Sequence, residues 1–204
     1  MTKTKIFTLL FVPIIAFLGW RLAYGIYSQI KMAKDIEISE YQVIEKLKLI
    51  RAAQKEYFAK YNRYTGSWDT LAMFIEKDTV YNVSKRDVII PRKPNDPRAY
   101  LGDSVRIVYD TLSSQLAKDK LFPADKFPNF DAKSLRFIPN LDNKEFELFA
   151  GEITSGKNKI KMQVIEVVDK YPMDKTRKED DENPRRRFLR FGSRNEVTLS
   201  GNWE

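Results

Sequence analysis

The side chains with the types and spacing to do chemistry in this chain are carboxylates and arginines. The 204 residues include no cysteine and no histidine. Disulfides, thiol nucleophiles and the commonest general base and zinc ligand are therefore excluded. The sequence also has no glycine-rich phosphate loop and no H-E-x-x-H motif. We expect a protein that is not an enzyme.

Two short stretches bring carboxylates together. The stretch 140–145 (NLDNKE) carries Asp142 and Glu145, and the stretch 179–183 (EDDEN) carries Asp180, Asp181 and Glu182. Oxygen ligands at short spacing suit Ca²⁺, although neither stretch has the central glycine of a complete calcium loop. Two carboxylates alone can hydrolyse glycosides, but these lie in charged segments expected to face solvent. We predict no cofactor, with calcium at these residues as the alternative.

A third chemical signal is the arginine-rich stretch 183–194 (NPRRRFLRFGSR), in which Phe188 and Phe191 are interleaved with the arginines. Such a pattern suits phosphate contacts and base stacking. The acidic run directly before it would neutralise these charges, and a strand edge guarded by charge is the alternative. We therefore expect no nucleic-acid partner. The arginines in question are Arg185, Arg186, Arg187, Arg190 and Arg194.

The N-terminal region must be considered before any soluble domain. Residues 6–20 carry no charge, Arg21 interrupts, and the apolar run continues to Tyr27. About 20 apolar residues are enough to span a bilayer, and no small-x-small cleavage site follows them. We predict a retained transmembrane anchor over residues 6–27, with residues 1–5 cytoplasmic and a cleaved signal peptide as the alternative. The anchor residues are Ile6, Phe7, Leu9, Leu10, Phe11, Ile14, Ile15, Phe17, Leu18 and Trp20.

A long amphipathic helix is predicted over residues 28–62. Residues 28–61 contain neither glycine nor proline, and apolar residues recur three or four positions apart. A coiled coil would fit the same spacing, but Gln54 and the tyrosines in the seam favour packing on a sheet. The residues expected to pack the helix on the sheet are Val43, Leu47, Ile50, Tyr57, Tyr61, Tyr64 and Trp68.

Residues 63–204 are predicted to form a β-rich domain. A short helix should begin at Ser67. A strand or a hairpin is expected within 80–90, and strands are expected within 104–112, 134–140, 145–153 and 159–168. Near the end of the chain Val197 and Leu199 alternate. Three prolines within residues 91–97 mark a loop. Residues 154–158 (TSGKN) are expected to form a hairpin turn, and the charged run 173–187 is expected to form a mobile surface loop. The fold class is therefore α+β: an anchor helix continues into an amphipathic helix covering a four-stranded antiparallel sheet. At the corner, Asn62 and Gly66 are expected to supply unusual backbone angles.

These features resemble type IV pilins and type II secretion pseudopilins. Residues 7–10 (FTLL) are similar to the start of the hydrophobic pilin helix, and residues 50–71 are similar to the region where that helix leaves its sheet. The chain also resembles single-pass envelope proteins of Gram-negative bacteria that end in the residues SGNW. It departs from pilins in having Lys5 and Ile6 before the mature start, and Phe11 in place of a glutamate that some tip-type pseudopilins also lack.

The resemblance implies a non-enzymatic, membrane-anchored component of a secretion, pilus or motility assembly. It implies a bacterial inner-membrane location, with the C-terminal domain in the periplasm. The expected partners are the membrane, other envelope proteins and further copies of the chain. An accessory subunit that binds a partner without forming a filament, or a periplasmic binding module, are the alternatives.

Overall fold

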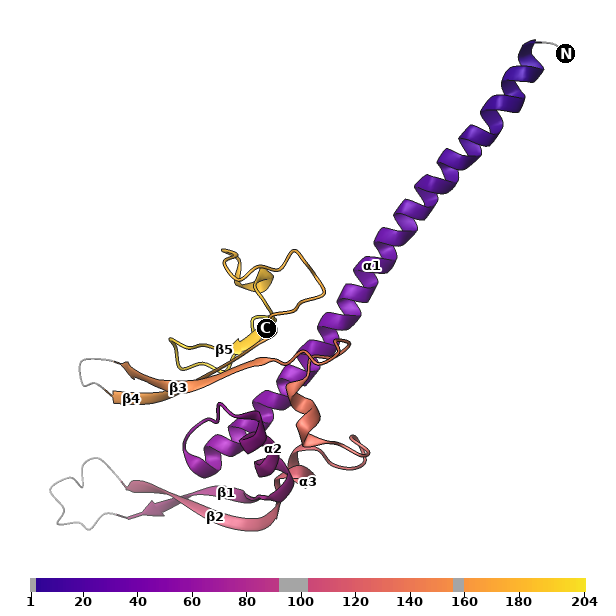
Figure 1. Ribbon diagram of the computed structural model, residues 1–204. Coiled ribbons are helices and arrows are strands. Elements are labelled where there is room, and N and C mark those ends of the chain that lie inside the picture. The colour runs from indigo at the N-terminus through magenta and orange to yellow at the C-terminus, as the bar shows by residue number, and fades with distance from the viewer. Residues whose placement is uncertain (1–2, 92–102, 156–159) are drawn as a thin grey trace.

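The computed structural model describes residues 3–91, 103–155 and 160–204. One long helix crosses the whole molecule, and two small antiparallel sheets lie beside its C-terminal half (Figure 1). The fold is α+β, as the sequence predicts. The proline loop and most of the 154–158 turn lie outside the described residues. The elements are α1 (Lys3–Tyr61), α2 (Trp68–Lys77), β1 (Thr79–Ile90), β2 (Ser104–Leu116), α3 (Ala117–Leu121), η2 (Ala132–Arg136), β3 (Glu147–Ser155), β4 (Ile160–Val168), η3 (Pro184–Arg186) and β5 (Arg190–Gly192).

Helix α1 is continuous for 59 residues, a length of about 90 Å. The absence of glycine and proline from residues 28–61 allows unbroken hydrogen bonding, and Pro13 near the other end does not interrupt the helix. The helix ends because Asn62 adopts a left-handed conformation, with φ of 54°. Its N–H donates to the carbonyl of Phe58 over 2.8 Å, which is a usual helix C-cap.

Helix α2 begins where the sequence predicts. Ser67 is its N-cap, and the Ser67 side chain accepts a hydrogen bond from the backbone N–H of Thr70. The apolar side of α2 is buried against α1 and η2. Gly66 does not adopt a left-handed conformation, so the prediction of unusual backbone angles at the corner holds for Asn62 and is wrong for Gly66.

The strands form two separate sheets among the described residues, so the expected single four-stranded sheet is wrong. Strands β1 and β2 make a two-stranded antiparallel ribbon, with Thr79 opposite Leu116 at its base and Ile90 opposite Ser104 near its tip. Strands β3, β4 and β5 form an antiparallel three-stranded sheet in that order. Helices α2 and α3 lie between the ribbon and α1 (Figure 1).

One predicted strand is absent for a local reason. Residues 134–140 contribute to η2 and a turn, because Ala132 and Leu135 are buried three residues apart, a spacing that suits a 3₁₀ helix. The alternating residues Val197 and Leu199 lie outside any strand. The last strand, β5, lies instead within the arginine-rich stretch and pairs with β4.

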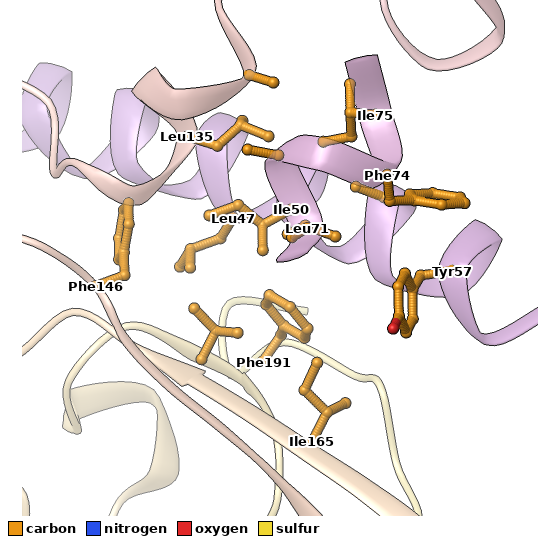
Figure 2. Close-up of a cluster of buried hydrophobic side chains, with 14 of the residues drawn as sticks. Leu47, Ile50, Tyr57, Leu71, Phe74, Ile75, Leu135, Phe146, Ile165 and Phe191 are labelled. Carbon is orange, nitrogen blue, oxygen red and sulfur yellow. The ribbon is translucent and has the colours of Figure 1, made fainter. Parts of the chain in front are cut away.

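The core is built around one face of α1. Figure 2 shows Leu47 and Ile50 between Leu71 and Leu135 on one side and Ile165 and Phe191 on the other. The buried face of α1 therefore lies between α2 and η2 above and the three-stranded sheet below. Burial of each large apolar side chain contributes about 1.5–3 kcal/mol relative to exposure, so this face fixes the rod to the domain.

Candidate functional site: the exposed surfaces of helix α1 and of the ribbon

The first half of α1 is exposed although it is apolar. It is the one candidate membrane span in the described part of the chain, and none of its most apolar window is buried inside the protein. The side chains of Phe11, Ile14, Ile15, Phe17, Leu18 and Trp20 all face solvent, and the predicted anchor residues Ile6, Phe7, Leu9 and Leu10 belong to the same helix. The length and composition of this segment are sufficient for a bilayer span. A signal sequence would meet the same two criteria.

Aromatic side chains collect near the end of this apolar segment. Trp20 stacks on Tyr24 with 6.0 Å between ring centroids, and Phe17 lies 6.2 Å from Trp20. Tyr27 is also exposed. Aromatic rings of this kind prefer the level of the lipid headgroups, so the segment up to Tyr27 has the make-up of a span and its interface.

The helix then runs free before it enters the domain. Val43 is the first fully buried side chain of α1, and it lies 16 residues after Tyr27, or about 24 Å along the helix axis. Ile30, Ile38 and Tyr41 are exposed in this segment. If the anchor spans a bilayer, the domain is thus held away from the headgroups by a rigid spacer.

An ion pair strengthens the point where α1 enters the domain. Arg177 donates to both carboxylate oxygens of Glu40, with Nε–Oε1 of 2.5 Å and Nη2–Oε2 of 2.8 Å. Its Nη1 also donates to the backbone carbonyls of Arg185 and Arg187. The Glu40 carboxylate raises the pKa of Arg177. We call these contacts the Arg177 clasp: they tie the charged loop to α1, although the sequence predicts that loop to be mobile.

A buried carboxylate lies near the clasp. Asp169 is 2% exposed, and its Oδ1 accepts from the backbone N–H of Tyr171 over 2.8 Å. Burial raises the pKa of Asp169, while the Tyr171 hydrogen bond and the charge of Arg177 oppose the rise. This group and Glu40 were missed from the sequence, because neither stands in a recognisable motif and only the fold brings them near the loop.

The corner after α1 is fixed by a buried amide. Gln54 is fully buried. Its Nε2 donates to the carbonyl of Thr65 over 2.9 Å, and its Oε1 accepts from the N–H of Thr65 over 3.2 Å. Tyr64 stacks on Phe58 with centroids 4.7 Å apart. The side chain of Gln54 thus acts as a short strand partner that holds the returning chain.

The residues predicted to pack the helix on the sheet divide into two groups. Val43, Leu47, Ile50 and Tyr57 are buried, whereas Tyr61 is 42% exposed and Tyr64 and Trp68 are half-buried. Tyr57 lies 5.2 Å from the ring of Phe74, and Tyr61 lies 6.2 Å from it. The tyrosines at the end of α1 therefore contact α2.

The arginine-rich stretch takes part in an ion-pair network on the three-stranded sheet. Glu166 is bonded by Arg190 over 3.3 Å and by Arg194 over 2.7 Å. Glu147 pairs with Arg194 and with Lys170, and Arg190 also pairs with Glu179. The hydrogen bond that Lys170 donates contributes most to lowering the pKa of Glu147. The hydrogen bond that Arg194 donates to Glu166 contributes most to raising the pKa of Arg194.

This network lines an open groove of about 720 Å³. Positive and negative side chains alternate along this groove. Arg190, on β5, and Arg194, just after β5, are both neutralised by Glu166. Arg187 donates its Nε–H to the carbonyl of Asp181. Arg185 and Arg186 are exposed. The absence of a nucleic-acid partner stays a prediction.

The calcium candidates do not come together. Within the part of the chain that the structure describes, no group of three or more Asp and Glu side chains is placed to hold a metal ion. Glu145 lies 3.2 Å from Arg136 Nε. Asp142, Asp180 and Glu182 are exposed, and Asp181 is half-buried. The arrangement gives no support to a calcium site.

The β1–β2 ribbon carries the other large exposed apolar surface. Ile89, Val105, Ile107 and Tyr109 are all at least 45% exposed. The alternation of residues 105–109 predicts a strand, but a period of two does not reveal whether the apolar side faces the core.

Comparison of the chain with protein-family models, curated proteins and solved structures finds no match. The evidence on its function therefore comes from the exposed surfaces of α1 and of the ribbon.

Proposed function

We propose that this chain is a non-enzymatic, membrane-anchored component of a cell-envelope assembly, pilin-like in layout, in a secretion, pilus or motility system. One observation supports this most: α1 is a single helix whose first part exposes apolar side chains and whose last part lies in the core of the domain. A helix built in this way joins a hydrocarbon phase to a folded body without a hinge. The Arg177 clasp adds to that rigidity.

We propose the inner membrane of a bacterium as the location, with the domain in the periplasm. Lys3 and Lys5 precede the span, and basic residues favour the cytoplasmic side. The stretch of α1 between Tyr27 and Glu40, where Arg177 of the domain binds, is about 20 Å long and then holds the domain away from the outer headgroups. At that height the domain can reach other envelope proteins.

A second candidate is an accessory subunit that binds a partner and forms no filament. The residue that favours it is Phe11, which occupies the place where pilins carry a glutamate. In pilins that glutamate is thought to pair with the free amino end of the neighbouring subunit. A chain without it lacks one contact that holds a filament together.

Membrane insertion is tested with a matched pair of charge substitutions. Ile15→Arg places a cation near the middle of the span, and Ile38→Arg places one in the exposed spacer. A central arginine costs about 2.5–3.5 kcal/mol on an insertion scale. We expect wild type and Ile38→Arg to resist carbonate extraction of membranes, and Ile15→Arg to be released in larger part. Extraction of wild-type chain without detergent would refute the anchor.

Orientation and assembly need two further measurements. Because the chain has no cysteine, Lys175→Cys provides a single label site in the exposed loop. We expect a membrane-impermeant maleimide to label it in spheroplasts before lysis; labelling only after lysis would place the domain in the cytoplasm. Long fibres, or disulfides between copies carrying Leu18→Cys, would favour the pilin-like candidate. A stoichiometric complex with other envelope proteins would favour the accessory subunit.

A further inference from the structure

The β1–β2 ribbon has its most exposed apolar side chains on the side that faces away from the core. Val80, near the base of β1, is buried in the core. Side chains alternate along a strand, so Arg86 and Val88 lie on the same side as Val80. The odd-numbered residues Lys85, Asp87 and Ile89 lie on the opposite side, which we call the outer face.

The partner strand places further apolar residues on the outer face. Tyr109 lies opposite Lys85, Ile107 opposite Asp87, and Val105 opposite Ile89. The exposed fractions are 67% for Tyr109, 65% for Ile89, 62% for Val105 and 45% for Ile107. By contrast, the core side carries the exposed ion pair between Arg86 and Asp110, at 2.8 Å. The core side also carries Val88 and Val108, which are half-buried. The outer face is therefore apolar although nothing in the described chain covers it, which burial in the chain's own core would not select.

A ribbon with an uncovered apolar face is poorly suited to stand alone. An isolated two-stranded hairpin is marginally stable in water and needs a further layer on its apolar face. Contiguous exposed apolar side chains of this kind commonly mark an interaction surface. The ribbon also projects to the side of the domain, away from the N-terminal end of α1 (Figure 1), so a partner can approach it.

We propose that the outer face is a docking surface for a second copy of this chain. Charge complementarity within the outer face favours this occupant. From the Lys85–Tyr109 pair to the Ile89–Val105 pair, the charged residues of the outer face are Lys85 and Asp87, and both are exposed. Neither has an ion-pair partner among the described residues. They are two residues apart on one strand, with opposite signs.

A two-fold axis explains that spacing. If the axis lies between the two outer faces, across the strands and midway between positions 85 and 87, strand β1 faces β1 of the second copy in the opposite direction. Lys85 then lies opposite the second copy's Asp87, and the reverse pair forms as well. The same operation sets Tyr109 against the second copy's Ile107. A face that is complementary to itself is what a two-fold homodimer interface requires.

The size of the face indicates where docking takes place. It is a few residue pairs long, and a standard interface buries about 800 Å² on each partner. The pair is therefore expected to be weak between free molecules and to form when two anchors share one membrane, because tethering raises the effective concentration. In this respect alone the inference rests on the proposed membrane anchor.

The test uses full-length chain and charge reversal. A cysteine at Ser113, on the core side of the ribbon, carries donor or acceptor dyes, and energy transfer between copies is measured in lipid vesicles and at raised protein concentration in detergent. We expect Lys85→Asp and Asp87→Lys each to weaken association about tenfold or more, because like charges then oppose one another. A mixture of the two variants should associate again, and so should the double variant Lys85→Asp/Asp87→Lys.

Arg86→Asp is the matched control, since it reverses a charge on the core side of the same strand and should leave association unchanged. Far-ultraviolet circular dichroism checks that each variant is folded. Equal association of wild type and both single variants would overturn the proposal, as would recovery of the chain only with a different protein. Vesicle flotation separates the docking hypothesis from the membrane-anchor hypothesis. If the chain floats with vesicles but energy transfer does not depend on the charges, docking alone is refuted. If charge-dependent energy transfer occurs in detergent but the chain does not float with vesicles, the anchor alone is refuted.

Discussion

Replacement of Gln54 by methionine isolates the hydrogen bonds that close the corner after α1. Methionine has nearly the same length and volume as glutamine, so the substitution leaves no large cavity. It does leave the N–H and the carbonyl of Thr65 without their partner. Thr65 is itself only 7% exposed, and water has little access to the two freed groups.

The expected loss follows from those two groups. An unsatisfied buried polar group costs about 1–3 kcal/mol, and the apolar methionine side chain regains part of that sum by burial. We expect Gln54→Met to lower the free energy of unfolding by about 2–4 kcal/mol. For a domain of this size, that corresponds to a fall in Tm of roughly 6–12 °C.

Thermal and urea unfolding of the full chain in detergent micelles, followed by near-ultraviolet circular dichroism, measures this loss. Gln42→Met is the matched control, because Gln42 lies on the same helix but is exposed and bonds the exposed Asn140. We expect the control to change stability by less than about 0.5 kcal/mol. A Gln54→Met protein as stable as wild type would show that the amide does not hold the corner.

Three further predictions concern single contacts. Arg177→Met should speed hydrogen exchange in the charged loop, and a double-mutant cycle with Glu40→Gln should give a coupling of about 1–3 kcal/mol; zero coupling would refute the clasp. Burial raises the pKa of Asp169 above 3.8, so its contribution to stability should fall as pH rises through that raised pKa. Asp169→Asn should therefore gain stability over wild type toward neutral pH and lose that advantage in acid, a trend that melting curves across pH would reveal or contradict. Gly192 has φ of +78°, and a Cβ there would lie 2.0 Å from the carbonyl oxygen of Ile165. Gly192→Ala should lower Tm by several degrees. Gly66→Ala should be tolerated, because a Cβ at position 66 would lie 3.5 Å from its nearest neighbour, the backbone nitrogen of Ala150.

The sequence determined the elements whose cause is local. Apolar residues three and four apart, without glycine or proline, fixed the long helix through Tyr61. Ser67 marked the start of α2, and Asn62 marked the end of α1. The apolar residues 6–20 identified a possible membrane span, because a bilayer span depends on length and composition alone.

Tertiary structure decided which elements meet. Alternating apolar residues identify a strand but not the layer that covers it, so the split into two sheets and the outward apolar face of the ribbon were not visible. Leu135 and Phe137 alternate as in a strand, but Leu135 is buried together with Ala132 at the spacing of a 3₁₀ helix. Contacts between distant residues, such as Glu40 with Arg177, leave no periodic trace in the sequence. They exist because packing brings together segments more than a hundred residues apart.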